Sequence, residues 1–189
     1  MATHESITPS TAILVLASQC PQGQLAGRTR TQKLLYFLRE RLPIAASYTP
    51  YYYGPYSEEV TASLDSLVAR GLLQEQVEPV DTEGPFEGRL HRYMLTRDGR
   101  EVLDSLRLEH RDEVVRIEEA AGEVLGRNAS TATLAVASKL HYIVKSAAKP
   151  VPQKELSAKA RGFGWHVDPS EIANGVKFLL GMGLVTKGS

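Results

Sequence analysis

The residues able to do catalytic chemistry are few and scattered along the chain. The sequence contains one cysteine, Cys20, and five histidines that occur singly: His4, His91, His110, His141 and His166. It has no Gly-rich phosphate loop, His-Glu-x-x-His, nucleophile elbow or Cys-x-x-Cys motif. Lone histidines are usually structural, and we interpret Cys20, next to Pro21, as a partly buried thiol at a helix end. We therefore expect no catalytic residue, no metal site and no cofactor. A site assembled across a dimer is a weaker alternative that motif analysis would miss.

Basic residues concentrate in the C-terminal quarter. The whole chain balances 22 Lys and Arg against 22 Asp and Glu, for a net charge of +0. Within it, Glu75–Val124 has seven basic residues against fourteen acidic ones, whereas Lys139–Ser189 has eight against three. Lys and Arg fix a protein on DNA phosphates, and Asn can read adenine edges. We expect the main DNA contacts from Lys154, Lys159, Arg161, Ser170, Asn174 and Lys177. Glu171 occupies a position where a base contact is usual, and we interpret it as the capping partner of Asp168.

A second basic group lies in the N-terminal half. Arg28, Arg30 and Lys33 occur on a helix predicted from about residue 29 to 42. On one interpretation they assist DNA binding through the phosphate backbone. The alternative is a solvated basic face, or salt bridges to Glu58 and Glu59.

Five of the eight tyrosines lie between residues 48 and 56. Alternation would place Tyr51 and Tyr53 on one face and Tyr52 on the other, with one face in the core and the other at a protein interface. The next predicted helix presents acidic side chains that would repel phosphate, so it is a poor DNA-recognition helix. The candidate partner-binding residues are Tyr51, Tyr52, Tyr53, Tyr56, Glu58 and Glu59.

The elements that must position these residues follow from periodicity and capping signals. Thr8-Pro9 begins the first helix, Pro21–Gly27 is a polar loop, and Ser57 caps a helix that ends at Gly71. Tyr48–Tyr53 is a β-prone run. The predicted hairpin has strands Leu72–Val80 and Arg89–Leu95 joined by a turn over 81–88. Three helices followed by a hairpin are typical of a winged-helix domain.

The second half is predicted to be helical. From Thr96 to Leu125 we expect one long helix or a helix pair with a partial heptad stripe at Leu103, Leu106, Val114, Ile117, Ala121 and Val124. This stripe either pairs with its copy in a dimer or packs against its own domain. Helices near 131–148, 152–160 and 168–180 form a helix-turn-helix unit. The predicted fold class is mainly α with small β-hairpins, in a tandem winged-helix/helix-turn-helix protein. We expect a winged-helix domain at 1–96, a connecting or dimerisation region at 97–127 and a helix-turn-helix domain at 128–189.

Composition is that of a globular protein. Of the 189 residues, 42% are hydrophobic and 23% are charged. No apolar run approaches the roughly 18 residues of a membrane helix, and the first residues lack a signal-peptide pattern. We expect a cytoplasmic protein with no membrane association.

Two short segments carry a family resemblance. They are the helix Gly27-Arg28-Thr29-Arg30-Thr31-Gln32-Lys33-Leu34-Leu35-Tyr36-Phe37-Leu38 and the block Tyr51-Tyr52-Tyr53-Gly54-Pro55-Tyr56-Ser57-Glu58-Glu59-Val60. Together they resemble the YwgA-type family of small bacterial and archaeal winged-helix proteins, and more loosely the Panacea antitoxin domain. The resemblance covers about residues 16–73 and implies a winged-helix fold with a regulatory or uncharacterised role.

Taken together, these features predict a non-enzymatic regulatory protein that binds double-stranded DNA through its C-terminal unit, as a homodimer. The alternative is a protein-interaction adaptor or antitoxin that binds a partner protein through the tyrosines and the acidic helix. The two hypotheses differ in the partner, which is DNA in the first and a protein in the second.

Overall fold

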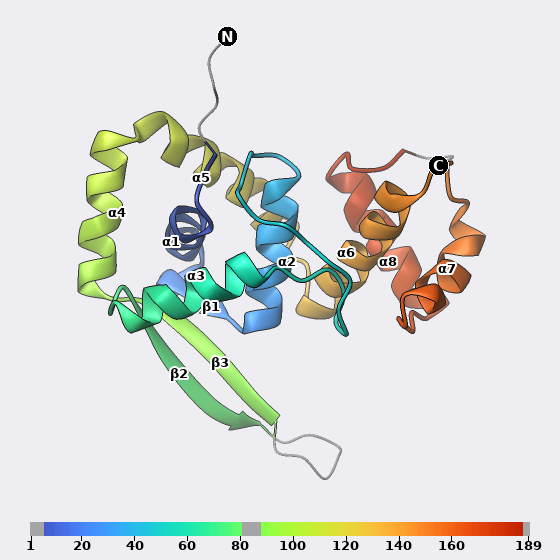
Figure 1. Ribbon diagram of the computed structural model, residues 1–189, viewed down its shortest axis with the longest axis horizontal. Helices are drawn as coiled ribbons and strands as arrows, with labels where there is room; N and C mark the ends of the chain where they lie inside the picture. Colours follow the sequence, from blue (N-terminus) through green and yellow to red (C-terminus); the bar gives the residue numbers. More distant parts are fainter. Residues whose placement is uncertain (1–5, 81–87, 187–189) are drawn as a thin grey trace.

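The computed structural model describes residues 6–80 and 88–186, which form eight α-helices and one small three-stranded antiparallel sheet (Figure 1). The helices are α1 (Pro9–Gln19), α2 (Arg28–Arg39), α3 (Glu58–Ala69), α4 (Arg97–Glu109), α5 (Arg111–Leu125), α6 (Thr131–Ser146), α7 (Leu156–Gly162) and α8 (Pro169–Gly181). Two 3-10 turns, η1 (Pro21–Gly23) and η2 (Gln153–Glu155), precede β1 and α7. Among the described helices, none has the length and apolarity to cross a membrane.

The helix starts follow the capping signals in the sequence. The Thr8 hydroxyl accepts a 3.1 Å hydrogen bond from the Thr11 N–H at the start of α1. Ser57 caps α3 in the same way through the Val60 N–H, at 3.3 Å. At α8, the Glu171 carboxylate accepts a 2.9 Å bond from the Asp168 N–H. Each contact provides an acceptor for a backbone N–H that has no partner within the helix.

The sheet is larger than the predicted hairpin. Strands β2 (Leu73–Val80) and β3 (Gly88–Leu95) pair with Leu73 opposite Leu95, and β1 (Gln24–Ala26) adds to the other edge of β3. The prediction of an all-loop segment over 21–27 is therefore wrong at these three residues. Leu25 is buried opposite Tyr93, so a tertiary contact creates a strand too short to leave a periodic signal. The turn predicted over 81–88 lies outside the described residues, apart from Gly88.

The predicted β-prone run at Tyr48–Tyr53 is not a strand. This segment is a loop in which Thr49 forms an isolated bridge with Tyr56 and the Gly54 N–H donates to the Tyr51 carbonyl at 3.0 Å. Gly54 has a φ of +103°, a conformation that favours glycine. The loop folds back on itself instead of extending, so it pairs with no neighbouring strand.

The segment 97–125 is a helix pair, and its apolar stripe packs within the chain. The pair breaks at His110, which has a φ of −129° and a ψ of 43°. Five members of the stripe are buried and Leu106 is partly buried. The stripe packs within the chain, because α5 lies against α1 and α2. The homodimer stays a prediction.

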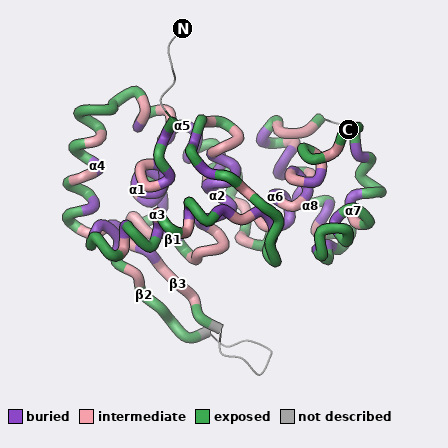
Figure 2. Tube along the Cα trace, in the orientation of Figure 1, coloured by how far each residue is buried: buried purple, intermediate pink, exposed green. Residues whose placement is uncertain are grey.

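The two halves of the chain share one hydrophobic core. Helix α2 lies between them and contacts α1 and α6. Figure 2 shows buried residues along all three helices, while the hairpin is mostly exposed or half-buried. The Phe37 ring on α2 lies 4.9 Å from the Phe178 ring on α8. The Tyr36 hydroxyl on α2 and His141 Nδ1 on α6 share a hydrogen bond of 2.8 Å. The predicted boundaries at residues 96 and 127 stay predictions.

Candidate binding surfaces

Gln32 on α2 fixes the end of the loop formed by residues 48–57, which we call the tyrosine loop. Its amide nitrogen donates to the Ser57 carbonyl at 2.8 Å and to the Thr61 hydroxyl at 2.9 Å. Its amide oxygen accepts from the Ser57 N–H at 3.1 Å. Since Gln32 is buried, these bonds are protected from competition by water. A single side chain thus satisfies both polar groups of the Ser57 backbone and anchors α3 to α2.

Lys33, the next residue, is buried and holds the same loop through a hydrogen bond. Its side chain is 2% exposed, and Nζ donates a 2.6 Å hydrogen bond to the Pro55 carbonyl. Burial, with a smaller contribution from the Lys139 charge, lowers the pKa of Lys33 to about 7. The prediction that Lys33 belongs to an outward basic face is wrong. Residues 31–38 are all buried, so this part of α2 has no outward face.

The tip of the tyrosine loop packs against the second half of the chain. The Trp165 indole N–H donates to the Tyr51 carbonyl at 2.7 Å, and Trp165 is itself buried. Gly54 faces α6 closely: a Cβ at this position would lie 3.0 Å from Lys139 Cγ and 3.2 Å from Ser138 Oγ. Contacts from α2, α6 and Trp165 therefore hold the backbone of the loop in one place.

The side chains at this tip point into solvent. Tyr51, Tyr52 and Tyr53 are 53%, 80% and 69% exposed. The Tyr51 ring contacts those of Tyr52 and Tyr56, each with centroids 5.1 Å apart. The prediction that one face of this run is core is wrong, because none of the three rings is buried; Tyr56 is half-buried. A hollow of about 140 Å³ lies beside them, lined by Arg28, Lys33, Thr61 and other residues.

The first two arginines of α2 have partners within the chain. Arg28 Nη2 lies 2.9 Å from Asp65 and 3.3 Å from Glu75, and the guanidinium lies 5.8 Å from the centre of the Tyr93 ring. Arg30 donates to the Ala129 carbonyl at 2.8 Å. Salt bridging was one of the alternatives for this group, but the acidic partners are Asp65 and Glu75 rather than the predicted Glu58 and Glu59.

The outward face of α3 is acidic, as the sequence indicates. Glu58, Glu59 and Asp65 are all exposed. Glu59 accepts a 2.8 Å hydrogen bond from the Ser57 hydroxyl. The pKa of Glu59 is lowered, first by its own backbone N–H and then by this hydroxyl, so its carboxylate stays ionised. The face next to the tyrosine loop carries negative charge.

The C-terminal candidates lie on the outside of α7 and α8 and the turn before α7. All six predicted DNA-contacting residues, Lys154, Lys159, Arg161, Ser170, Asn174 and Lys177, are exposed, and the salt bridges between described residues include none of them. Asn174 and Lys177 share an open hollow of about 780 Å³ with residues 126–130 and Thr133. Lys154 lines a different hollow, beside Pro169 and Ile172. The structure thus separates Lys154 from Asn174 and Lys177.

Arg127 is a candidate that no local sequence pattern indicates. It is a single cation in the break between α5 and α6, and it lines the same hollow as Asn174 and Lys177. Its guanidinium donates to the Gly181 carbonyl at the end of α8. A contact between residues 54 positions apart leaves no local pattern, so only the fold reveals it.

Glu171 caps α8 by accepting a hydrogen bond from the Asp168 N–H, as interpreted from the sequence.

The titratable groups elsewhere sit in structural contacts. His141 Nδ1 bonds Tyr36, and burial lowers the pKa of this histidine. His91 Nδ1 lies 2.7 Å from Glu75, whose carboxylate also accepts from the Tyr93 hydroxyl at 2.6 Å. Burial raises the pKa of the Cys20 thiol. Within residues 6–80 and 88–186, no group of three His, Cys, Asp or Glu side chains is placed to hold a metal.

These features define a mainly helical protein with a small antiparallel sheet and two exposed candidate surfaces. The chain is similar to the uncharacterized protein YwgA of Bacillus subtilis (strain 168), with 35% identity over 91 residues. The match covers 48% of this chain and 52% of YwgA, so the chain spans about half the length of this curated relative. No family model matches. The resemblance to YwgA is confirmed, whereas the looser one to the Panacea antitoxin domain stays a prediction.

Proposed function

We propose that this chain is a non-enzymatic regulatory protein that binds a partner protein through the tyrosine loop and the acidic face of α3. In this proposal α1–α3 and the β2–β3 hairpin form a winged-helix unit, and α6–α8 form a helix-turn-helix unit. The observation that carries the proposal is a loop with a firmly held backbone and three consecutive exposed tyrosines.

Exposed tyrosines on a fixed loop are well suited to binding. A tyrosine ring contributes a large contact area, and its hydroxyl still finds a hydrogen-bond partner in a partly wet interface. Tyrosine is also enriched among the residues that dominate interface energies. Gln32, Lys33 and Trp165 already hold the loop, so binding would lose little additional backbone freedom. Tyr52, with the most exposed ring, is the central candidate.

Charge favours a basic protein partner at this surface over nucleic acid. Glu58, Glu59 and Asp65 are exposed on the helix that would enter DNA in a winged-helix unit, and carboxylates repel phosphates. The three cations of α2 that were DNA-binding candidates offer little compensation, because Lys33 is buried and Arg28 and Arg30 already have partners. Positively charged groups on a partner would match the acidic face.

The test is co-purification with the products of neighbouring genes, using wild-type protein and the double variant Tyr52→Ser/Tyr53→Ser. We expect one protein to co-purify stoichiometrically with the wild type and to be lost with the double variant. The matched control is Leu108→Ser, which removes a side chain that is 86% exposed on α4. A partner retained by both variants, or no partner for the wild type, would reject the tyrosine loop as the binding site.

Double-stranded DNA is the second candidate partner, through α8. It is favoured by one specific observation: the exposed cations of α7 and α8 form no salt bridge with the described residues, unlike Arg28. Asn174 and Lys177 lie together on α8, next to Arg127. This surface and the tyrosine loop use different residues, so each can be tested without the other.

A further inference from the structure

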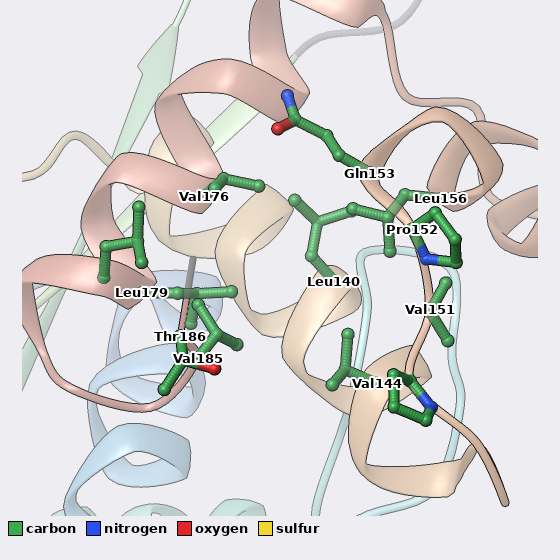
Figure 3. A pocket seen from close by; sticks show the side chains of 12 residues that line it. Leu140, Val144, Val151, Pro152, Gln153, Leu156, Val176, Leu179, Val185 and Thr186 are labelled. Atoms are coloured by element: carbon green, nitrogen blue, oxygen red, sulfur yellow. The ribbon is translucent and has the colours of Figure 1, made fainter. Parts of the chain in front are cut away.

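A cavity of about 510 Å³ lies between α6, residues 150–156 and α8 (Figure 3). Its walls include Leu140 and Val144 from α6, and Val176 and Leu179 from α8. Val151 and Leu156 close the side opposite α8. Leu140, Leu156 and Leu179 are almost completely buried, whereas Pro150, Pro152, Gln153 and Thr186 in the same lining are exposed. The cavity is therefore an apolar cleft that is open to solvent on one side and reaches the hydrophobic core on the other.

The lining has a distinct chemistry. None of the residues that line the cavity is charged, and nearly all are aliphatic or proline. The polar side chains are those of Gln153 and Thr186. In Figure 3 the Gln153 amide lies at the end of the cavity near Val176, and Thr186 lies beside Val185 and Leu179. The hollow next to Asn174 is different, because it is lined by Arg127, Lys177 and several polar side chains.

From this geometry we propose that the cavity binds a small uncharged organic molecule with an apolar body and one hydrogen-bonding group. Its volume is within the range of about 300–1,000 Å³ that small-molecule sites occupy, and such sites combine apolar walls with a few polar groups. The body would pack against Leu140, Val176 and Leu179, and the polar group would reach the Gln153 amide. A charged group placed among these side chains would lose its hydration without an ionic partner in the lining, so the site favours an uncharged ligand over a charged one.

The apolar walls of this site are separate from both candidate surfaces. Val176 and Leu179 face the cavity, whereas Asn174 and Lys177 line the hollow on another side of α8. Gln153 alone also lines the hollow next to Lys154. The tyrosine loop contributes no residue to the lining. Ligand binding can therefore succeed or fail whatever the result for protein or DNA binding.

The test uses three probes with the same alkyl chain: octan-1-ol, octanoate and octylammonium. Methyl NMR spectra of the full chain, labelled at Leu and Val, report where each probe binds. We expect octan-1-ol to shift the signals of Leu140, Val144, Val176 and Leu179 saturably. The charged probes should bind about tenfold or more weakly, because the cavity offers their head groups no counter-charge.

Two cavity-filling variants provide the decisive comparison. Val176→Trp should weaken octan-1-ol binding by about tenfold or more by occupying the site, and Val144→Phe is the alternative if the first variant does not fold. The control is Val115→Trp, on the exposed side of α5. The proposal is overturned if octan-1-ol gives no saturable shift, if all three probes bind equally, or if a folded filling variant binds like the wild type. It is also overturned if sedimentation shows a dimer that the filling variant dissociates, because a second copy would then occupy the cavity.

Discussion

The Lys33 ammonium on α2 donates a 2.6 Å hydrogen bond to the carbonyl of Pro55 in the tyrosine loop. Gln32 makes the neighbouring contacts to Ser57. The two segments that carry the resemblance to the YwgA-type family thus meet in space, where one braces the other. Gln32 and Lys33 maintain the shape of the loop, whereas the rings of Tyr52 and Tyr53 stay exposed.

The buried Lys33 should make stability depend on pH. Its pKa is about 7 in the folded protein and about 10.4 in an unfolded chain. Between these values the unfolded state binds more protons, so the free energy of unfolding should rise with pH, by at most about 1.4 kcal/mol per pH unit. Urea unfolding of wild type and Lys33→Met at pH 7, 8 and 9 measures this. We expect the wild type to gain stability relative to the variant as pH rises. Parallel profiles would show that Lys33 stays protonated when buried.

Removing the Gln32 amide should destabilise the protein and release the tyrosine loop. In Gln32→Met the buried Ser57 N–H loses its acceptor, while the Ser57 carbonyl keeps the Thr61 N–H. An unsatisfied buried donor costs about 1–3 kcal/mol, so we expect a decrease of this size in the free energy of unfolding. Hydrogen exchange should also become faster in residues 51–57. The control Gln19→Met changes an exposed glutamine and should have little effect. Equal effects of the two variants would show that the Gln32 hydrogen bonds to Ser57 do not stabilise the loop.

The two glycines of α4 and α5 should respond to alanine in opposite directions. A Cβ on Gly99 would lie 2.1 Å from the Leu72 carbonyl oxygen, which also accepts from the Thr96 N–H. Gly99→Ala should therefore destabilise the protein by about 1–3 kcal/mol. Nothing lies within 4 Å of a Cβ on Gly122, so Gly122→Ala should stabilise the helix by about 0.5–1 kcal/mol. Thermal unfolding of both variants checks the pair, and two changes of the same sign would contradict the packing of α4 against Leu72.

Local signals predicted most of the elements but not the contacts between them. Thr8, Ser57 and Asp168 mark helix starts because a cap is a contact between near neighbours in the chain. The strand β1 and the role of Arg127 depend on residues more than 50 positions away, and no periodicity encodes them. The position of Lys33 differs from its prediction for a related reason. Its charge indicates an exposed face, but α6 and the tyrosine loop cover this side of α2.

DNA binding through α7 and α8 should depend on Arg161, on α7, and Lys177, on α8. Both are exposed and form no salt bridge with a described residue, so both charges are available to phosphates. We expect Lys177→Ala/Arg161→Ala to weaken binding and to reduce the slope of log K against log salt by about 1 for each lost phosphate contact. Fluorescence anisotropy with duplex DNA over a salt series measures both effects. Lys145→Ala is the control, because that ammonium lies 2.6 Å from Glu40 and should contribute little. If the double variant binds like the wild type, α8 is not the DNA surface; if the wild type binds no duplex at about 100 mM salt, DNA is not the partner.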